Sequence, residues 1–386
     1  MKMLRIPTII GGALLVGFLA QVGAETIFDD TPVPPVGAPG GPRVELSADD
    51  LESFKRGRLL FDRDWHQADG LGTPEINADS CRGCHEDPAI GGAGGLDLNV
   101  FRYGFDDNGN GPFENLPGGQ VASKMRAPSV PGRDEIDPTS DVFEQRQTPS
   151  VFGGGLIDTI FQEEILANED PDDEDGDGIR GVARMHDVAG VLEVGRFGWK
   201  AQIPTLRDFL RDALGGETGI TVPDDGRGFG MLTDDDTVAD PEISEDELDD
   251  LDMFASNLSA PQRRNADAPS VLIGEGLFDT VGCANCHIPS LEGSEGPVFL
   301  YSDLLLHNIM PDDFRGMAET DAGVGVFQTP PLWGISRTAP YLHDGRATTL
   351  TDAIMNHDGE AALVRAEFEA LSATDKVALI RFLESL

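Results

Sequence analysis

The stretch Cys81-Arg82-Gly83-Cys84-His85 decides the fold, together with a second copy, Cys283-Ala284-Asn285-Cys286-His287. The spacing C-x-x-C-H is typical of covalent haem attachment, in which both thiols form thioethers and the histidine binds the iron. The two motifs contain all four cysteines of the chain. The sequence therefore predicts two c-type haems, with His85 and His287 as iron ligands.

Two other interpretations of the cysteines remain open at this point. Both pairs could converge on one structural zinc ion, although about 200 residues separate them. Disulfide bonds could also use all four cysteines, but they would leave both histidines unexplained.

The N-terminus has the three parts of a secretory signal peptide. Lys2 and Arg5 precede an apolar run over residues 9–20, and Val22-Gly23-Ala24 supplies small residues for cleavage. Residues 1–24 are therefore predicted to be a signal peptide that is removed, which gives a periplasmic or otherwise exported location that suits c-type haem attachment. An uncleaved membrane anchor is the alternative, although the apolar run is short for a membrane span. Elsewhere the sequence predicts no membrane span.

The formal net charge of −41 argues against nucleic acid or an anionic membrane surface as a partner. It favours a small cationic redox protein as electron donor. A solvated acidic surface that only keeps the protein soluble explains the charge equally well.

Composition and helix-start signals divide the chain further. Residues 25–46 are rich in proline and glycine and are predicted to be a flexible tether. Ser47 is a candidate N-cap for the first helix of a haem domain over residues 47–264. A second haem domain is predicted over residues 265–386.

The two halves share landmarks in the same order. Gly57-x-x-x-Phe61 and Gly274-x-x-x-Phe278 precede the haem motifs, and each half ends on a capped helix, after Ser244 and Ser372. A repeated order of landmarks indicates internal duplication. The predicted fold is mainly α, with two cytochrome c-like haem domains, the first enlarged by loop insertions.

Several blocks resemble the bacterial di-haem cytochrome c peroxidase superfamily. They are the two haem motifs, Arg146-Gln147-Thr148-Pro149, Thr329-Pro330 and Pro340-Tyr341-Leu342-His343-Asp344-Gly345. Gly195-Arg196-Phe197-Gly198-Trp199-Lys200 and Tyr301-Ser302-Asp303-Leu304-Leu305-Leu306-His307 are similar, more narrowly, to its di-haem oxidoreductase branch.

The resemblance implies one electron-transfer haem and one haem that reacts with peroxide. Its second haem takes a distal ligand eight residues after the threonine that corresponds to Thr349, which is His357 here. Relatives commonly have methionine, so a bis-histidine haem of lower potential is expected. Met355 is a competing ligand. A non-enzymatic di-haem electron carrier, or an oxidase of an organic, thiol or protein substrate, remains an alternative function.

Other side chains are weaker candidates. Glu163 and Glu164 could move a proton between peroxide oxygens, although surface positions explain them as well. His307 and His343 stand in family-typical blocks and either line a haem pocket or pack structurally. Trp199 and Trp333 could relay electrons, but packing explains both.

Asp173-x-Asp175-x-Asp177-Gly178 and Asp106-x-Asn108-x-Asn110-Gly111 each resemble the first half of a Ca²⁺ loop. Neither has the closing glutamate. The first loop is the favoured Ca²⁺ site, and a solvated acidic loop is the alternative.

The first haem is predicted to keep an open or weakly occupied site for peroxide or another small oxidant. Many relatives carry a displaceable histidine where this chain has Phe101, and no histidine occurs over residues 86–185. Met125 or a distant histidine is the alternative ligand.

Overall fold

The computed structural model describes residues 32–72, 77–116, 121–122 and 136–386. The predicted signal peptide and Met125 lie outside these residues. Residues 33–386 form one compact unit. The division of this unit into two haem domains near residue 265 stays a prediction.

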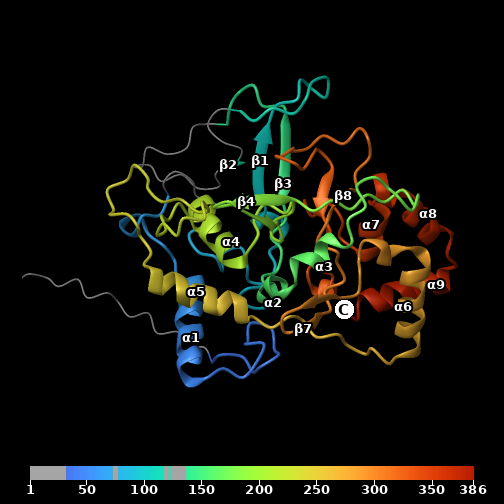
Figure 1. Ribbon diagram of the computed structural model, residues 1–386, viewed down its shortest axis with the longest axis horizontal. Helices are drawn as coiled ribbons and strands as arrows, with labels where there is room; N and C mark the ends of the chain where they lie inside the picture. Colours follow the sequence, from blue (N-terminus) through green and yellow to red (C-terminus); the bar gives the residue numbers. More distant parts are fainter. Residues whose placement is uncertain (1–31, 73–76, 117–120, 123–135) are drawn as a thin grey trace, which may run out of the picture. The chain divides into compact units, whose positions relative to one another are not determined.

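The described residues contain short strands and helices in alternation (Figure 1). The α-helices are α1 (Ala48–Asp62), α2 (Gly154–Thr159), α3 (Gln162–Leu166), α4 (Leu206–Ala213), α5 (Glu245–Asn257), α6 (Pro269–Val281), α7 (Leu350–Met355), α8 (Ala362–Ala370) and α9 (Ala373–Leu383). The strands are β1 (Val100–Gly104), β2 (Val121–Ala122), β3 (Val142–Arg146), β4 (Met185–Val188), β5 (Val191–Val194), β6 (Leu291–Gly293), β7 (Gly296–Val298), β8 (Leu306–Asn308) and β9 (Val326–Gln328).

Helix α1 precedes the first haem motif in the chain and α5 follows it, and the two helices pack closely against each other (Figure 1). Ser47 caps α1 by accepting the N–H of Asp50, and Ser244 opens α5 in a capping box. Gly57 allows the close approach, because a Cβ there would lie 1.8 Å from the carbonyl oxygen of Asp250. The sequence predicted both caps correctly.

Helices α6 and α9 repeat this arrangement around the second motif. A Cβ on Gly274 would lie 2.0 Å from the carbonyl oxygen of Ala378. Phe278 packs on Phe382 with ring centroids 5.0 Å apart, as Phe61 packs on Phe254 at 5.3 Å. Ser372 caps α9 by accepting the N–H of Asp375, as the sequence predicted.

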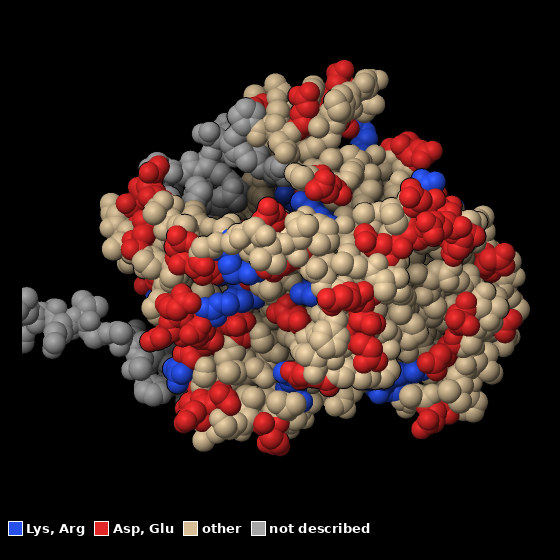
Figure 2. Space-filling model, viewed as in Figure 1, with Lys and Arg blue, Asp and Glu red and all other residues tan. Residues whose placement is uncertain are grey.

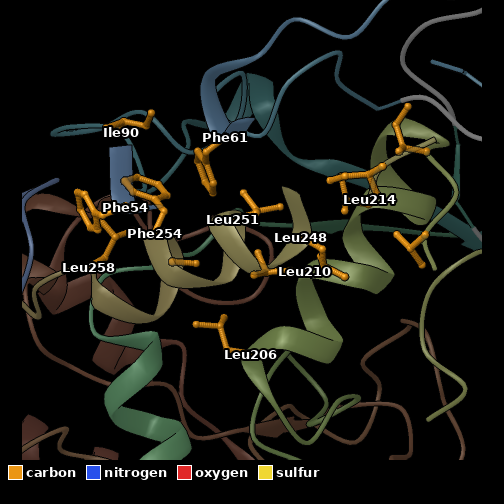
Figure 3. Packing of buried hydrophobic residues seen from close by; sticks show 14 of the residues in the cluster. Phe54, Phe61, Ile90, Leu206, Leu210, Leu214, Leu248, Leu251, Phe254 and Leu258 are labelled. Atoms are coloured by element: carbon orange, nitrogen blue, oxygen red, sulfur yellow. The ribbon is translucent and has the colours of Figure 1, made fainter. Parts of the chain in front are cut away.

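Helices α4 and α7 form a third matching pair, which the sequence analysis missed. Thr205 caps α4 by accepting the N–H of Asp208, and Thr349 caps α7 by accepting that of Asp352. Leucines of α4 point into the core formed with α1 and α5 (Figure 3). Helix α7 packs against α9 in the same way.

The mainly helical expectation holds for the cores around the motifs, but the strands were not predicted. Among the described residues, β1 pairs with β2 and β3 in a three-stranded antiparallel sheet, and the six other strands form three antiparallel pairs: β4–β5, β6–β7 and β8–β9. β8 and β9 join residues 306–308 to residues 326–328. These strands are short, so their alternation is too brief to be recognised in the sequence.

The prediction of a flexible tether is wrong for residues 33–46. Pro42 forms a bridge with Leu258, and the N–H of Arg43 donates to the carbonyl oxygen of Asn257. Val33 and Leu46 pack against the first core. The prolines and glycines therefore form turns that the end of α5 holds in place.

Candidate functional site: two haem motifs

The first haem motif is a tight loop directly after α1. The N–H of Arg82 donates to the carbonyl oxygen of Phe61 at 3.0 Å, and the N–H of His85 donates to that of Cys81 at 3.0 Å. His85 Nδ1 lies 3.1 Å from the carbonyl oxygen of Gly92, and Phe61 packs on the ring. This contact fixes the ring and leaves Nε2 for a metal, as in iron-binding and zinc-binding histidines.

The second motif has the same geometry. The N–H of His287 donates to the carbonyl oxygen of Cys283 at 3.0 Å, and His287 Nδ1 lies 3.0 Å from that of Tyr301. Phe278 packs on the imidazole with a centroid distance of 6.3 Å. The donor set of each motif therefore fits one haem.

His357 lies close to His287. Burial, and next the nearby His357, lower the pKa of His287 to about 4. His357 Nδ1 lies 2.8 Å from the carbonyl oxygen of Ala353, so Nε2 is available. Met355 instead packs against the second core. This placement favours His357 over Met355 as the ligand opposite His287.

In the first half, the position that corresponds to His357 is Ala213. Both residues follow the capping threonine of their helix, Thr205 or Thr349, by eight positions. After Ala213 the chain continues as a single π-helical turn, Leu214–Thr218. An alanine has no atom that can bind iron, and π-helical turns are frequent at functional sites.

Glu217, in this π-helical turn, lies near the first motif. Its carboxylate accepts a hydrogen bond from Asn77 Nδ2 at 2.8 Å, and its carbonyl oxygen accepts the N–H of Asn77. Burial raises the pKa of Cys81 to about 12, and the charges of Cys84 and Glu217 add to this shift. Burial likewise raises the pKa of Cys283 to about 12.

The model of the family described as "Di-haem oxidoreductase, putative peroxidase" matches residues 139–386. The chain belongs to this family. A di-haem oxidoreductase has haem as its cofactor, and the geometry of both motifs fits that group. No curated protein matches the chain.

Two solved structures are similar to this di-haem oxidoreductase at low identity. A Kuenenia stuttgartiensis hydrazine synthase, pressurised with xenon, is 16% identical with a TM-score of 0.42, covering 94% of this chain and 100% of that chain. A MauG-like protein associated with microbial copper homeostasis is 17% identical with a TM-score of 0.43, covering 92% of this chain and 94% of that chain.

The weak catalytic candidates of the sequence lie on α3. Glu163 is exposed and Glu164 is half-buried. Helix α3 contacts β5 and β6, and Gln162 beside them accepts the N–H of Val194. Among the described contacts, none brings either glutamate to Cys81 or His85.

The predicted Ca²⁺ loop forms turns that its own carboxylates hold. Asp173 accepts the N–H of Gly178, and Asp177 accepts a hydrogen bond from Asn285 Nδ2 at 3.0 Å. In this loop, one carboxylate oxygen from each of Asp170, Asp173 and Asp175 lies within 4.8 Å of the other two. Asp177 therefore links the loop to the second haem motif, and Ca²⁺ binding stays a prediction.

His307 lies in a buried acidic cluster that the sequence did not reveal. Its Nε2 lies 2.9 Å from Asp303 and its Nδ1 lies 3.1 Å from Glu360. These hydrogen bonds outweigh burial and raise the pKa of His307 to about 12, so the ring is an imidazolium. Glu360 also accepts the N–H of Arg180, which ties the acidic loop to the segment that carries His357.

The two tryptophans occupy different places. Trp199 Nε1 donates to the carbonyl oxygen of Gln147 at 2.8 Å, and its ring lies edge-on to His343 at 6.5 Å. Trp333 packs beside Gly153 and the core around Leu304 and Leu305. Trp199 thus contacts segments from both halves of the sequence.

Among the described residues, no helix is long and apolar enough to cross a bilayer.

Proposed function

We propose that this protein is an exported di-haem c-type oxidoreductase that reduces peroxide at the motif of His85, with electrons entering at the motif of His287. The observation that carries the proposal is the contrast between Ala213 and His357. His357 lies near His287, and the matching position after the cap of α4 is an alanine, which supports an open first site.

The chain's residues divide the work accordingly. The carbonyl oxygens of Gly92 and Tyr301 orient His85 and His287 for iron binding. His357 closes the second site against small oxidants, whereas Ala213 leaves room at the first. When bound, the haems supply electron storage and the iron at which the O–O bond of peroxide breaks.

Glu217 is the carboxylate best placed to move a proton at the first site. It stands four residues after Ala213, about one helical turn further, and its negative charge helps to raise the pKa of Cys81. Proton transfer by a positioned carboxylate typically contributes a factor of about 10² to 10⁴. We therefore expect Glu217→Gln to slow the reaction with peroxide by about that factor and to change its pH profile, while Glu163→Gln and Glu164→Gln leave both unaltered. Equal losses in all three variants would reject this role for Glu217.

The electron donor of this proposal is a small cationic redox protein. Asp and Glu side chains are spread over the visible face of the molecule (Figure 2), and the net charge of −41 attracts a positive partner at long range. Such an attraction weakens with salt. Reduction by a cationic cytochrome should therefore slow steeply as ionic strength rises.

The first experiment is the intact mass of protein secreted to the periplasm. The mass should equal that of the chain from Glu25 plus two haems, attached at the four cysteines. A mass equal to the bare chain would end the proposal.

The second experiment adds peroxide to the reduced protein and follows the spectra of both haems. Oxidation that begins at the first haem supports the enzyme, and no spectral change at either haem indicates an electron carrier.

Ca²⁺ at the loop of Asp173, Asp175 and Asp177 is a smaller part of the proposal. A chelator should lower both the bound calcium and the melting temperature. If neither changes, the loop is only solvated.

A further inference from the structure

A group of buried polar side chains gathers around Arg146, at the end of β3. Arg146 is 7% exposed, yet its guanidinium donates no hydrogen bond. Its Nη2 lies 2.6 Å from Glu144 Oε1, as an ion pair without hydrogen-bond alignment, and 3.9 Å from Glu319 Oε1. The guanidinium carbon lies 5.3 Å from the centre of the Phe327 ring. Most of the donors of Arg146 are therefore unused.

His343 shares the Phe327 ring with Arg146. Its imidazole stacks on Phe327 with a centroid distance of 3.9 Å and an interplanar angle of 13°. The side chain is 2% exposed, and neither ring nitrogen has a hydrogen-bond partner. Burial lowers the pKa of His343 to about 2, so the ring is neutral and offers one N–H donor.

Two amide oxygens beside this pair are also without partners. Gln147 Oε1 and Asn99 Oδ1 belong to side chains that are 4% and 0% exposed. Gln147 is tied to both neighbours, because its N–H donates to the carbonyl oxygen of His343 at 2.6 Å and its amide donates to that of Gly94. Native proteins leave few buried polar atoms unsatisfied. The unpartnered donors of Arg146 and His343, rather than these two acceptor oxygens, indicate that a hydrogen-bond acceptor completes the site.

The charged side chains around Arg146 indicate whether that polar group is positive or negative. In the described part of the chain, the carboxylates near Arg146 are Glu144, Glu319 and Asp344, and the nearby cations are Arg102, Arg184, Lys200 and Arg346. Burial, and then Arg146, lower the pKa of Lys200 to about 7, so the cations already repel one another. The cations outnumber the carboxylates here, and the buried guanidinium of Arg146 keeps unused donors, so an anion is the group that best completes the site.

The site lies between the first haem motif and a cavity. Gly94, which Gln147 contacts, lies against the carbonyl oxygen of Cys84. On the other side, Glu144, Phe314 and Gly345 line a cavity of 390 Å³. Phe314 packs on His343, so only this layer separates the cavity from the site.

We propose that Arg146, with His343, forms a binding site for a carboxylate group. The planar fork of arginine matches the two oxygens of a carboxylate, and the His343 N–H can complete the contact. The carboxylate is either a propionate of the first haem or a small carboxylic acid that enters through the cavity. The first source rests on the proposed haem attachment, whereas the second does not.

Arg146→Gln and Arg315→Gln of the haem-loaded protein test the proposal. Arg315 lines the same cavity but pairs with Asp106, so its variant is the matched control. For a haem propionate, Arg146→Gln should lower the reduction potential of the first haem and leave the second unchanged. For a free acid, acetate should bind the wild type saturably, and Arg146→Gln should weaken acetate binding about tenfold or more.

A crystal structure of the wild-type holoprotein decides the matter even if Arg146→Gln does not fold. A carboxylate in contact with Arg146 supports the proposal and identifies its source, and water alone there overturns it. Unchanged potentials together with no acetate binding also overturn it. The intact mass of the same sample reports haem attachment separately, so a failure of the proposed function is distinguished from a failure of the carboxylate site.

Discussion

The two halves of the chain share the contacts that hold the haem-motif histidines, but they differ eight residues after the capping threonines of α4 and α7. Phe61 and Phe278 pack on His85 and His287, and each imidazole is oriented by a backbone carbonyl oxygen. Eight residues after the capping threonine of α4 or α7, Ala213 stands where the other half has His357. The shared contacts explain how each motif is held. The difference between Ala213 and His357 explains why the two halves are proposed to do different chemistry.

The glycines at the helix crossings test the similarity and should give the largest effects. In Gly57→Ala or Gly274→Ala, the new Cβ would lie 1.8 or 2.0 Å from a carbonyl oxygen, so each helix pair must separate. We expect each change to lower the free energy of unfolding by about 3 kcal/mol or more. Chemical denaturation measures this, and Gly276→Ala, in open space on α6, should be neutral or stabilising. A small effect at only one crossing would show that the halves pack differently.

Ala213→His tests the difference between the halves. A histidine there should turn the first haem from high-spin to low-spin and slow its reaction with peroxide by roughly 100-fold, if about 1% of molecules keep an open site. Electron paramagnetic resonance and stopped-flow absorption measure the two effects. Ala370→His, at an exposed position of α8, is the control. A first haem that stays high-spin would mean that α4 does not correspond to α7.

The reverse change removes the ligand from the second half. His357→Ala should turn the second haem high-spin and raise its potential, while the first haem stays as it was. His66→Ala, at an exposed position, should change neither spectrum. If His357→Ala alters only the haem at Cys81 and Cys84, the assignment of the two sites is reversed.

A half-buried carboxylate of α2, beside the start of α4, gives a pH-dependent effect on stability. Asp158 accepts the N–H of Leu206, and burial raises the pKa of Asp158 to about 7. The folded state therefore holds a proton that the unfolded chain releases near pH 4, so the stability due to this group falls as the pH rises from about 4 to 7. A plot of unfolding free energy against pH for Asp158→Asn should be shallower over this range, by at most about 4 kcal/mol in total and by less where water screens this half-buried carboxyl. Thermal melts at each pH measure it. An unchanged slope, equal to that of exposed Asp235→Asn, would contradict the shift.

The sequence predicted the features that depend on neighbouring residues. The caps at Ser47, Ser244 and Ser372 were recognisable because a capping side chain and its partner are three residues apart. Ala213 was missed because an absent ligand leaves no motif, and only the matching caps at Thr205 and Thr349 reveal its position. The site at Arg146 was also missed, since β3, Lys200, Phe327 and His343 meet only through tertiary packing.

The burial of Cys81 and Cys283 bears on how the protein matures. The thiolate is the reactive form of cysteine, and a thiol with a pKa of about 12 is almost entirely protonated at neutral pH. Once α1 and α6 have packed, these thiols are therefore poor nucleophiles. Under the proposed function, we expect haem attachment to take place on the unfolded chain, so that the haems become part of the cores around which the two halves fold.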